Sequence, residues 1–383
     1  LGGNGMSKNK SISILLGLIL TFLVVGCSDA NDTSVGGNGD DQADEEEIVL
    51  RLATQINPKH AWWEGTVVPW MERVEEITDG RVQFETFTSA ELVAGDEELN
   101  ALKDGTVDIS LIHPSYYPDQ FPLMEVSMLP LPESDVEIAA HAWKRLFESD
   151  EPLVDGKTFY ESQIEDNGLF ALAITPTWQY SLSTTGKEIN TPDDVKGLTV
   201  RSPSRIHDIF AEKVGMSTAT IAGAEVYEAL SRGTVDGTFN AVADWTGWGY
   251  QDVLRYTITG LDFGYFGVMI AMSNEKWSSL PEDVQDAIIE AHEDVFDKGI
   301  QEWFERVDPI VEDNEEQGGV FVDFEELDSE IKELFSESVA ETWFDYIDLL
   351  EESGLPGKEL VTLWRDLVVQ EGGLAPEEIM DLE

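Results

Sequence analysis

The chain has 383 residues and a formal net charge of −54, from 77 acidic and 23 basic residues. This balance excludes nucleic acid as a partner, because phosphate binding needs clustered lysine and arginine. The acidic residues are spread along the chain, so its surface repels itself in dilute buffer and is screened at ~1 M salt, where the Debye length is roughly 3 Å. Adaptation to a salt-rich environment is the simplest interpretation.

Residues 1–27 carry a predicted export signal. Two lysines, Lys8 and Lys10, precede an apolar run over 12–25 that is too short for a comfortable membrane span. The run ends in Val-Val-Gly-Cys, and Cys27 is the single cysteine of the chain. This ending resembles a bacterial lipobox, in which the cysteine receives a diacylglycerol group. An uncleaved signal anchor is the alternative. One cysteine also excludes an internal disulfide framework and a metal site built from several cysteines.

Residues 28–47 form a predicted disordered tether. They contain GGNG and DDQADEEE, with dense negative charge and no apolar periodicity. Such a segment cannot bury enough surface to fold. The folded part is therefore expected from about Ile48, and its length suits two lobes of ordinary size.

From Ile48 onward, strand-like and helix-like segments alternate. Short apolar runs predict strands at 48–53, 82–88, 169–174 and 198–200. Capped or amphipathic segments predict helices at 63–78, 191–197, 204–214, 281–311, 326–350 and 358–370. The alternation predicts an α/β class with largely parallel strand pairing.

An eight-residue near-repeat predicts two lobes of similar plan. ALKDGTVD at 101–108 and ALSRGTVD at 229–236 are identical at six positions. Each copy ends a predicted helix with a glycine at the left-handed cap position and then enters a predicted strand. The helices are 98–104 and 225–232, and the strands are 106–112 and 234–240. Chance recurrence of a common junction is the alternative.

Two polar residues stand at the carboxyl ends of predicted strands, where open α/β sheets bind ligands. Arg201 follows the strand 198–200, and Asn240 ends the strand 234–240. The planar fork of an arginine suits a two-bond grip on a carboxylate, and an asparagine can supply an amide donor beside it. A surface ion pair with one of the many acids is the alternative for Arg201.

Three tryptophans are candidates to line a pocket because they lie in turn-rich segments just past predicted strands or just past Asn240. They are Trp178, Trp245 and Trp248. A position in the core is the ordinary role of this residue type.

The sequence contains none of the common catalytic motifs. Its five histidines lack the HExxH spacing, and GxSxG, P-loop and GxGxxG patterns are absent. Paired carboxylates carry no information in so acidic a chain. We therefore predict a protein without enzymatic activity, cofactor or metal.

The stretch TPDDVKGLTVR at 191–201 resembles the solute-binding proteins of tripartite ATP-independent periplasmic (TRAP) transporters, DctP type. Other stretches that look like this family are EVYEAL at 225–230, GTVDG at 233–237, SAEL at 89–92 and WSSLP at 277–281. The likeness covers roughly Ile48 to Val311, and the extension beyond Val311 matches poorly.

The resemblance implies a two-lobed, type II-like periplasmic binding fold with hinge strands and a long connecting helix. The lobes would close over a ligand in the cleft between them. The implied lobe I comprises 48–177 plus about 266–305. The implied lobe II comprises 178–265 plus about 306–383, including the C-terminal helices.

The resemblance also implies a ligand site. The arginine matching Arg201 grips the ligand carboxylate, and the asparagine matching Asn240 assists. The other aligned pocket positions are Gln55 to Asn57, Asp96, His113 and the turn Trp178–Ser181. The sialic-acid-binding branch keeps a second arginine near Tyr180–Ser181 and an acid near His113, and this chain departs from it at both places.

The missing second arginine indicates the class of ligand. A second carboxylate without a cation would cost several kcal/mol of desolvation in a closed cleft. The expected ligand is therefore a monocarboxylate, such as a 2-oxo or hydroxy acid, or a compact zwitterion held over an aromatic face. A C4-dicarboxylate is the alternative, since backbone donors at a helix N-terminus could replace the cation.

The predicted function is extracytoplasmic capture of a small organic acid by a lipid-anchored protein, for delivery to TRAP membrane subunits. The resemblance to the family implies that an ion gradient drives the transport. The alternatives are a binding protein of an ATP-driven importer, an exported hydrolase, and a lipoprotein with a structural or adhesive role.

Overall fold

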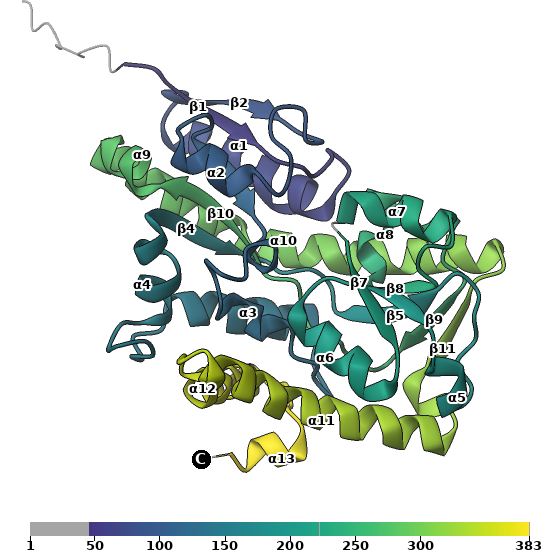
Figure 1. Ribbon diagram of the computed structural model, residues 1–383. Coiled ribbons are helices and arrows are strands. Elements are labelled where there is room, and N and C mark those ends of the chain that lie inside the picture. The colour runs from purple at the N-terminus through teal and green to yellow at the C-terminus, as the bar shows by residue number, and fades with distance from the viewer. Residues whose placement is uncertain (1–45, 222, 383) are drawn as a thin grey trace, which may run out of the picture. The chain divides into compact units, whose positions relative to one another are not determined.

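Two mixed sheets, each flanked by helices, organise the chain (Figure 1). The computed structural model describes residues 46–221 and 223–382. Within them, one sheet has the strand order β2-β1-β3-β10-β4 and the other β11-β9-β5-β8-β6-β7. We call the parts around these sheets lobe I and lobe II. The strands are β1 (Ile48–Ala53), β2 (Val82–Phe87), β3 (Ile109–Ile112), β4 (Leu169–Ile174), β5 (Tyr180–Thr184), β6 (Thr199–Ser202), β7 (Ser217–Thr220), β8 (Gly237–Ala241), β9 (Tyr256–Thr259), β10 (Val268–Ser273) and β11 (Val320–Asp323).

The helices confirm the predicted α/β class. They are α1 (Val68–Ile77), α2 (Glu98–Lys103), α3 (Val136–Phe147), α4 (Phe159–Gln163), α5 (Pro192–Val195), α6 (Arg205–Val214), α7 (Gly223–Ser231), α8 (Trp245–Trp248), α9 (Asn274–Ser279), α10 (Glu282–Glu316), α11 (Ser329–Glu352), α12 (Gly357–Gln370) and α13 (Glu377–Met380). In the part of the chain that the structure describes, no helix combines the length and the apolar composition of a membrane span. The predicted export signal and nearly all of the predicted tether lie outside the described residues.

Strand pairing is mixed rather than largely parallel as predicted, since five of the nine pairings among the described residues are parallel, β9–β11 included. Strands joined to their neighbours by helices are parallel, as in β1–β2, β1–β3, β6–β7 and β6–β8. Four pairings are antiparallel: β3–β10, β10–β4, β5–β8 and β5–β9. The physical reason is the passage between sheets. β4 leads the chain out of lobe I and β10 leads it back, so the two must run in opposite directions, and β5 and β9 stand in the same relation in lobe II.

The near-repeat folds into two matching junctions. Gly105 and Gly233 have left-handed backbones, with φ of 68° and 69°. The next residue donates its backbone N–H back to the alanine that opens each copy, at 2.9 Å in both. The chain is therefore still closing the helix at 106 and 234, and this is why the strands begin three residues later than predicted.

The aspartate that ends each copy ties the junction to the neighbouring strand. Asp108 Oδ2 accepts from the N–H of Arg51 in β1 at 2.8 Å, and Asp236 Oδ2 accepts from the N–H of Thr199 in β6 at 3.0 Å. The aspartates also donate their own N–H to the carbonyls of those same residues. Both lobes thus start a parallel strand pair in the same way.

Helix α10 belongs to both lobes. It has 35 residues, which corresponds to roughly 50 Å at 1.5 Å per residue. It packs against α1 and β4 of lobe I and against β11 of lobe II. Gly299 allows its close approach to lobe I, since a Cβ there would lie 2.5 Å from Thr66 Oγ1 and 2.9 Å from Thr175 Oγ1.

The C-terminal helices also contact both lobes. α11 packs against α6 of lobe II, while α12 packs against α3, which precedes β4 of lobe I. The buried indole of Trp343 in α11 donates to the carbonyl of Pro130 at 2.7 Å. The residue boundaries proposed for the lobes stay a prediction.

Candidate functional site

Arg201 lies in β6 and is 2% exposed, which contradicts the alternative of a surface ion pair. Its Nε donates to the carbonyl of Ile221 at 2.8 Å, and its Nη1 donates to the carbonyl of Phe239 at 3.2 Å. A guanidinium carries five N–H donors in one plane. The two backbone carbonyls therefore fix that plane, the hydroxyl of Tyr180 takes a further hydrogen bond, and up to two N–H groups remain for other acceptors.

The positive charge of Arg201 acts on the hydroxyls of three tyrosines. Tyr116 follows β3 in lobe I, whereas Tyr180 and Tyr250 belong to lobe II. Burial raises the pKa of each phenol, and the positive charge of Arg201 offsets part of that rise in all three. The hydroxyls stay protonated at neutral pH, so each can donate or accept a hydrogen bond. Tyr116 shows that the guanidinium lies at the boundary between the lobes.

Asn240 lies in β8, the strand next to β6, and is 3% exposed. Its side chain hydrogen-bonds toward Asp244, while its Oδ1 has no hydrogen-bond partner among the described residues. A buried amide oxygen without a partner is unfavourable, because its desolvation is not compensated. Here it leaves an acceptor available beside Arg201.

Three buried residues of lobe I form a polar cluster. The backbone N–H of Gln55 donates to Glu98 Oε1 at 2.7 Å, and Gln55 Nε2 lies 3.3 Å from His113 Nδ1. Glu98 Oε2 lies 3.5 Å from the same Nδ1. Burial raises the pKa of the Glu98 carboxyl, and its interactions with His113 oppose that rise.

Aromatic rings connect this cluster with the surroundings of Arg201. His113 stacks on Tyr116 with ring centres 5.4 Å apart. Phe266, in the segment between β9 and β10, lies 5.8 Å from Tyr116 and stacks at 6.2 Å on Tyr180. Flat apolar surface therefore lies between the cation of lobe II and the carboxyl of lobe I.

Direct polar contacts hold the two lobes together around these residues. His60 Nε2 of lobe I lies 2.7 Å from Asp244 Oδ1 of lobe II, and Trp248 Nε1 donates to Asp244 Oδ2 at 2.7 Å. Burial alone would raise the pKa of Asp244, but the charge of His60 and the hydrogen bonds from His60, Trp248 and Asn240 outweigh it and lower the pKa. Asn57 Nδ2 also donates to the carbonyl of Gly247 across the boundary.

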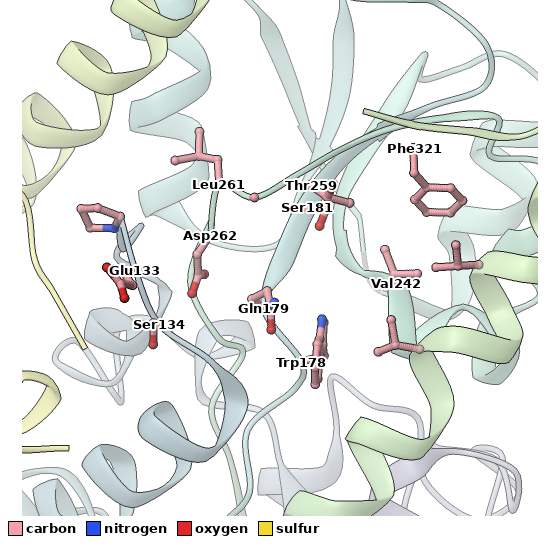
Figure 2. A pocket seen from close by; sticks show the side chains of 14 residues that line it. Glu133, Ser134, Trp178, Gln179, Ser181, Val242, Thr259, Leu261, Asp262 and Phe321 are labelled. Atoms are coloured by element: carbon pink, nitrogen blue, oxygen red, sulfur yellow. The ribbon is translucent and has the colours of Figure 1, made fainter. Parts of the chain in front are cut away.

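The other predicted residues lie elsewhere. Asp96 is exposed, two residues before the buried Glu98. Trp245 is fully buried and stacks on Phe321 in a core cluster of lobe II. Trp178 packs edge-on against Phe304 and lines a separate cavity, shown in Figure 2.

The residues that the sequence analysis missed are Glu98, Tyr116, Tyr250, His60 and Asp244. Nothing in GDEEL or in the run around Asp244 distinguishes the buried acid from its exposed neighbours. Glu98 is buried by residues of its own lobe, and Asp244 contacts His60 of the other lobe, so the burial of both depends on distant parts of the chain. No group of three or more potential metal ligands occurs in residues 46–221 or 223–382.

Comparison with protein families assigns most of the described residues to one family. The model of bacterial extracellular solute-binding protein, family 7 (DctP), matches residues 52–347. The match runs well past Val311, so the prediction that the C-terminal extension fits poorly is wrong for residues up to 347.

Curated relatives are identical to this chain at about a quarter of the aligned positions. The C4-dicarboxylate-binding periplasmic protein DctP of Rhodobacter capsulatus is 26% identical over 64% of this chain and 71% of its own length. A monocarboxylate 2-oxoacid-binding periplasmic protein of Nostoc sp. is 24% identical over 70% of this chain and 69% of its own. A solute-binding protein of Albidiferax ferrireducens is 23% identical over 56% of this chain, and this chain spans 62% of that relative's length.

Solved structures share the fold. A marine metagenome TRAP solute-binding protein specific for aromatic acid ligands superposes with a TM-score of 0.74 and 20% identity over 85% of this chain and 100% of its own. A TRAP solute-binding protein of Rhodoferax ferrireducens with copurified benzoate gives a TM-score of 0.72 and 21% identity over 85% of this chain and 98% of its own.

Proposed function

The chain belongs to bacterial extracellular solute-binding protein family 7, a family of non-enzymatic transporter components, and on that premise we propose that it captures a small organic acid for a TRAP-type secondary transporter. The observation that carries the proposal is Arg201. Its buried guanidinium is held in one plane by two backbone carbonyls. Among the described residues, no carboxylate accepts a hydrogen bond from its remaining N–H groups. Such a group suits the two oxygens of a ligand carboxylate.

The surroundings favour a monocarboxylate over a dicarboxylate. The acids nearest the site, Glu98 and Asp244, would repel a second carboxylate, and a buried charge without a counterion is costly. Phe266, Tyr116 and Tyr180 offer flat apolar contact for the body of the ligand. Relatives in the family bind both classes, as the Rhodobacter and Nostoc proteins illustrate, so the choice rests on these side chains.

Asn240 favours a hydroxy acid over a 2-oxo acid. Its free Oδ1 can accept a hydrogen bond from a hydroxyl, whereas it would face the lone pairs of a keto oxygen. We therefore propose a hydroxy monocarboxylate with an apolar or aromatic body as the ligand.

Calorimetry with matched ligands tests this function. Mandelate and phenylglyoxylate differ only in the hydroxyl and keto group, and succinate and malate represent dicarboxylates. We expect mandelate to bind at least tenfold more tightly than the other three, and at about 100 times its Kd to stabilise the fold by ~2.7 kcal/mol. Tighter binding of phenylglyoxylate would overturn the role of Asn240. Tighter binding of succinate or malate would overturn the monocarboxylate assignment, and no organic acid binding at all would overturn the function.

Closure of the lobes over the ligand is the proposed mechanism. The contact of His60 with Asp244 and that of Asn57 with Gly247 join the lobes next to Arg201, so ligand and interlobe contacts would stabilise the same closed arrangement. Small-angle scattering should show a smaller radius of gyration with saturating ligand. Superimposable curves with and without it would contradict closure.

Lipid attachment at Cys27 is the proposed means of retention at the membrane. The support is the lipobox-like ending of the apolar run and the absence of any other cysteine. Replacing Cys27 with alanine should release the protein from membranes while its melting temperature stays unchanged. Full membrane retention of that variant would contradict the anchor.

The proposed partners are the membrane subunits of a TRAP transporter, by family. An ATP-driven importer is the alternative partner. Co-purification of the ligand-loaded protein with detergent-solubilised membrane proteins from its source organism distinguishes the two transporters. Only the ATP-driven importer carries a nucleotide-binding subunit.

The acidic surface also supports the proposal that the protein is adapted to high salt. With a net charge of −54, repulsion within the folded chain should weaken as salt rises. The melting temperature should therefore increase between 0.1 M and roughly 1 M NaCl. A flat or falling curve would contradict salt adaptation.

A further inference from the structure

A cavity of about 280 Å³ lies where the chain passes between the lobes (Figure 2). Most of its walls come from the segment that leads into β5, the segment that leaves β9, helix α10 and the loop before α3, while Val242 after β8 and Phe321 in β11 complete them. Residues from these four elements include Trp178, Gln179, Leu261, Asp262, Val307 and Glu133. Arg201, Asn240 and the tyrosines around them do not line it. This cavity is therefore built from residues other than those of the proposed carboxylate site.

Two residues that line this cavity carry a buried hydrogen-bond acceptor. Asp262 is 6% exposed, and its Oδ1 accepts from the N–H of Gly264 at 2.7 Å. The hydroxyl of Tyr265 interacts with the same carboxyl, but Asp262 Oδ2 and that hydroxyl lack a hydrogen bond of regular geometry among the described residues. The Oε1 of Gln179 has no hydrogen-bond partner there either. Figure 2 shows both side chains on the cavity wall. Buried acceptors that lack a donor carry a desolvation cost that a bound donor would remove.

The rest of the lining defines what kind of donor fits. None of the fourteen lining residues is lysine, arginine or histidine, and Glu133 adds a second carboxyl. Trp178, Phe321 and Leu261 provide aromatic and aliphatic wall. The cavity is thus negative and rich in acceptors on one side and apolar on the other.

We propose that this cavity is a binding site for a small primary ammonium compound with a short hydrocarbon body. An ammonium group has three donors and no acceptor, which matches Asp262 Oδ2 and Gln179 Oε1. The hydrocarbon would pack on Trp178 and Leu261, where the indole face also attracts the cation. This site goes beyond the carboxylate function and does not depend on it.

Occupancy of this site would affect the hinge. Because its walls come from the segments that connect the lobes, an ammonium compound bound there would stabilise the interlobe arrangement described here relative to one that separates the walls. The coupling is reciprocal, so a ligand that favours the same arrangement would tighten ammonium binding.

The protonation of Asp262 provides an independent readout. Burial raises its pKa to about 7, the negative charge of Asp135 adds to the rise, and interactions with Tyr265 and the N–H of Gly264 oppose it. Glu133 is the other carboxyl on the cavity wall. An ammonium ion favours the ionised carboxyl, so binding should release a proton near neutral pH and tighten as the pH rises through about 7.

The test is calorimetry with n-butylammonium chloride, with n-butanol as the neutral match, at constant ionic strength set by NaCl. We expect saturable binding of the ammonium compound and none of the alcohol. Asp262→Asn keeps the acceptor for Gly264 and should weaken binding at least roughly tenfold, because a charge-assisted bond is lost. Gln179→Leu, at a partly exposed position, should weaken it several-fold. Asp104→Asn, at an exposed acid outside the cavity, should leave it unchanged.

Three outcomes would overturn the site. One is the absence of saturable heat from n-butylammonium with the wild-type protein. Another is wild-type affinity for n-butylammonium in both Asp262→Asn and Gln179→Leu, when both variants also have the wild-type melting temperature. The third is competition by KCl at equal concentration, which would indicate an inorganic cation. Loss of mandelate binding in any of these experiments concerns the carboxylate site and leaves the ammonium site to be judged by its own titration.

Discussion

The two helix–glycine–strand junctions share a backbone but differ in what they present to the site. In lobe I, Asp108 bonds the N–H of Arg51, and in lobe II, Asp236 bonds the N–H of Thr199. Two residues further along the neighbouring strand stand Ala53 in lobe I and Arg201 in lobe II. Four residues after each aspartate stand Ile112 and Asn240. One scaffold thus carries two buried apolar residues in one lobe and the candidate carboxylate site in the other.

The difference shows how a repeated frame can serve unequal roles. Lobe I has core residues at the two equivalent positions. Its polar groups lie next to the junction instead, at Glu98 at the start of α2 and at His113 after β3. Lobe II places its cation directly on the sheet, where strand pairing limits its movement. A rigid position suits the group that must meet both oxygens of a carboxylate.

The largest expected effect comes from breaking the contact that joins the lobes. His60→Leu leaves the buried Asp244 carboxyl without the imidazole whose Nε2 lies 2.7 Å from its Oδ1, and removing the partner of a buried charged group typically costs about 3 kcal/mol or more. Denaturant unfolding measures the loss. The double variant His60→Leu with Asp244→Leu is the control and should recover much of the stability. A single variant no less stable than the double would contradict the paired-charge assignment.

Arg201 and its counterpart Ala53 should separate affinity from stability. Arg201→Lys cannot reproduce the planar fork and should weaken mandelate binding at least roughly tenfold, since hydrogen bonds to charged groups are worth ~1.5–3 kcal/mol each. Ala53→Gly should leave affinity unchanged and lower stability by about 0.5–1 kcal/mol. Calorimetry and unfolding on both variants test the contrast, and wild-type affinity in Arg201→Lys would remove its proposed role.

Replacing either of the two repeat aspartates, Asp108 or Asp236, should lower the free energy of unfolding by the same amount. Asp108→Ala and Asp236→Ala each remove a charged acceptor from a strand N–H, and we expect each to lower the free energy of unfolding by roughly 1.5–3 kcal/mol at pH 7. Costs that differ by more than about 1 kcal/mol would show that the junctions are not energetically equivalent.

The contribution of Asp236 should also depend on pH. Burial opposes ionisation, but its bonds with Lys187 and the N–H of Thr199 outweigh it and lower the pKa in the folded state. A lowered pKa stabilises the fold above the ordinary pKa of an aspartate, and that stabilisation disappears as the pH falls through the folded value. The gap between wild type and Asp236→Ala should therefore narrow in acid, as unfolding at pH 7 and near pH 3 can measure.

Small effects on stability are also expected at the two junction glycines. Gly105 and Gly233 have nearly identical positive φ, and a Cβ added at either would meet no atom within 4 Å. Alanine should cost only the left-handed backbone penalty, roughly 1 kcal/mol at each position. Thermal unfolding of both variants provides the comparison, and a much larger loss at one glycine would reveal a contact specific to that lobe.

Local sequence determined much of this protein. Periodicity and caps placed β1, β4, α6 and α12 to within a residue, because each forms from its own apolar pattern and end signals. The near-repeat predicted two similar junctions, since glycine and aspartate perform local backbone tasks there. Arg201 and Asn240 could be named because each sits at the end of a strand and matches a family motif.

Tertiary structure decided the rest. The antiparallel pairings follow from how the chain passes between the sheets, which no local pattern encodes. The burial of Glu98 rather than Asp96, and the pairing of His60 with Asp244, depend on residues brought together from distant parts of the chain. The separation of Trp178 from Arg201 and the core position of Trp245 have the same origin. A side chain's type and spacing limit what it can do, but its neighbours across the fold set its charge, exposure and partners.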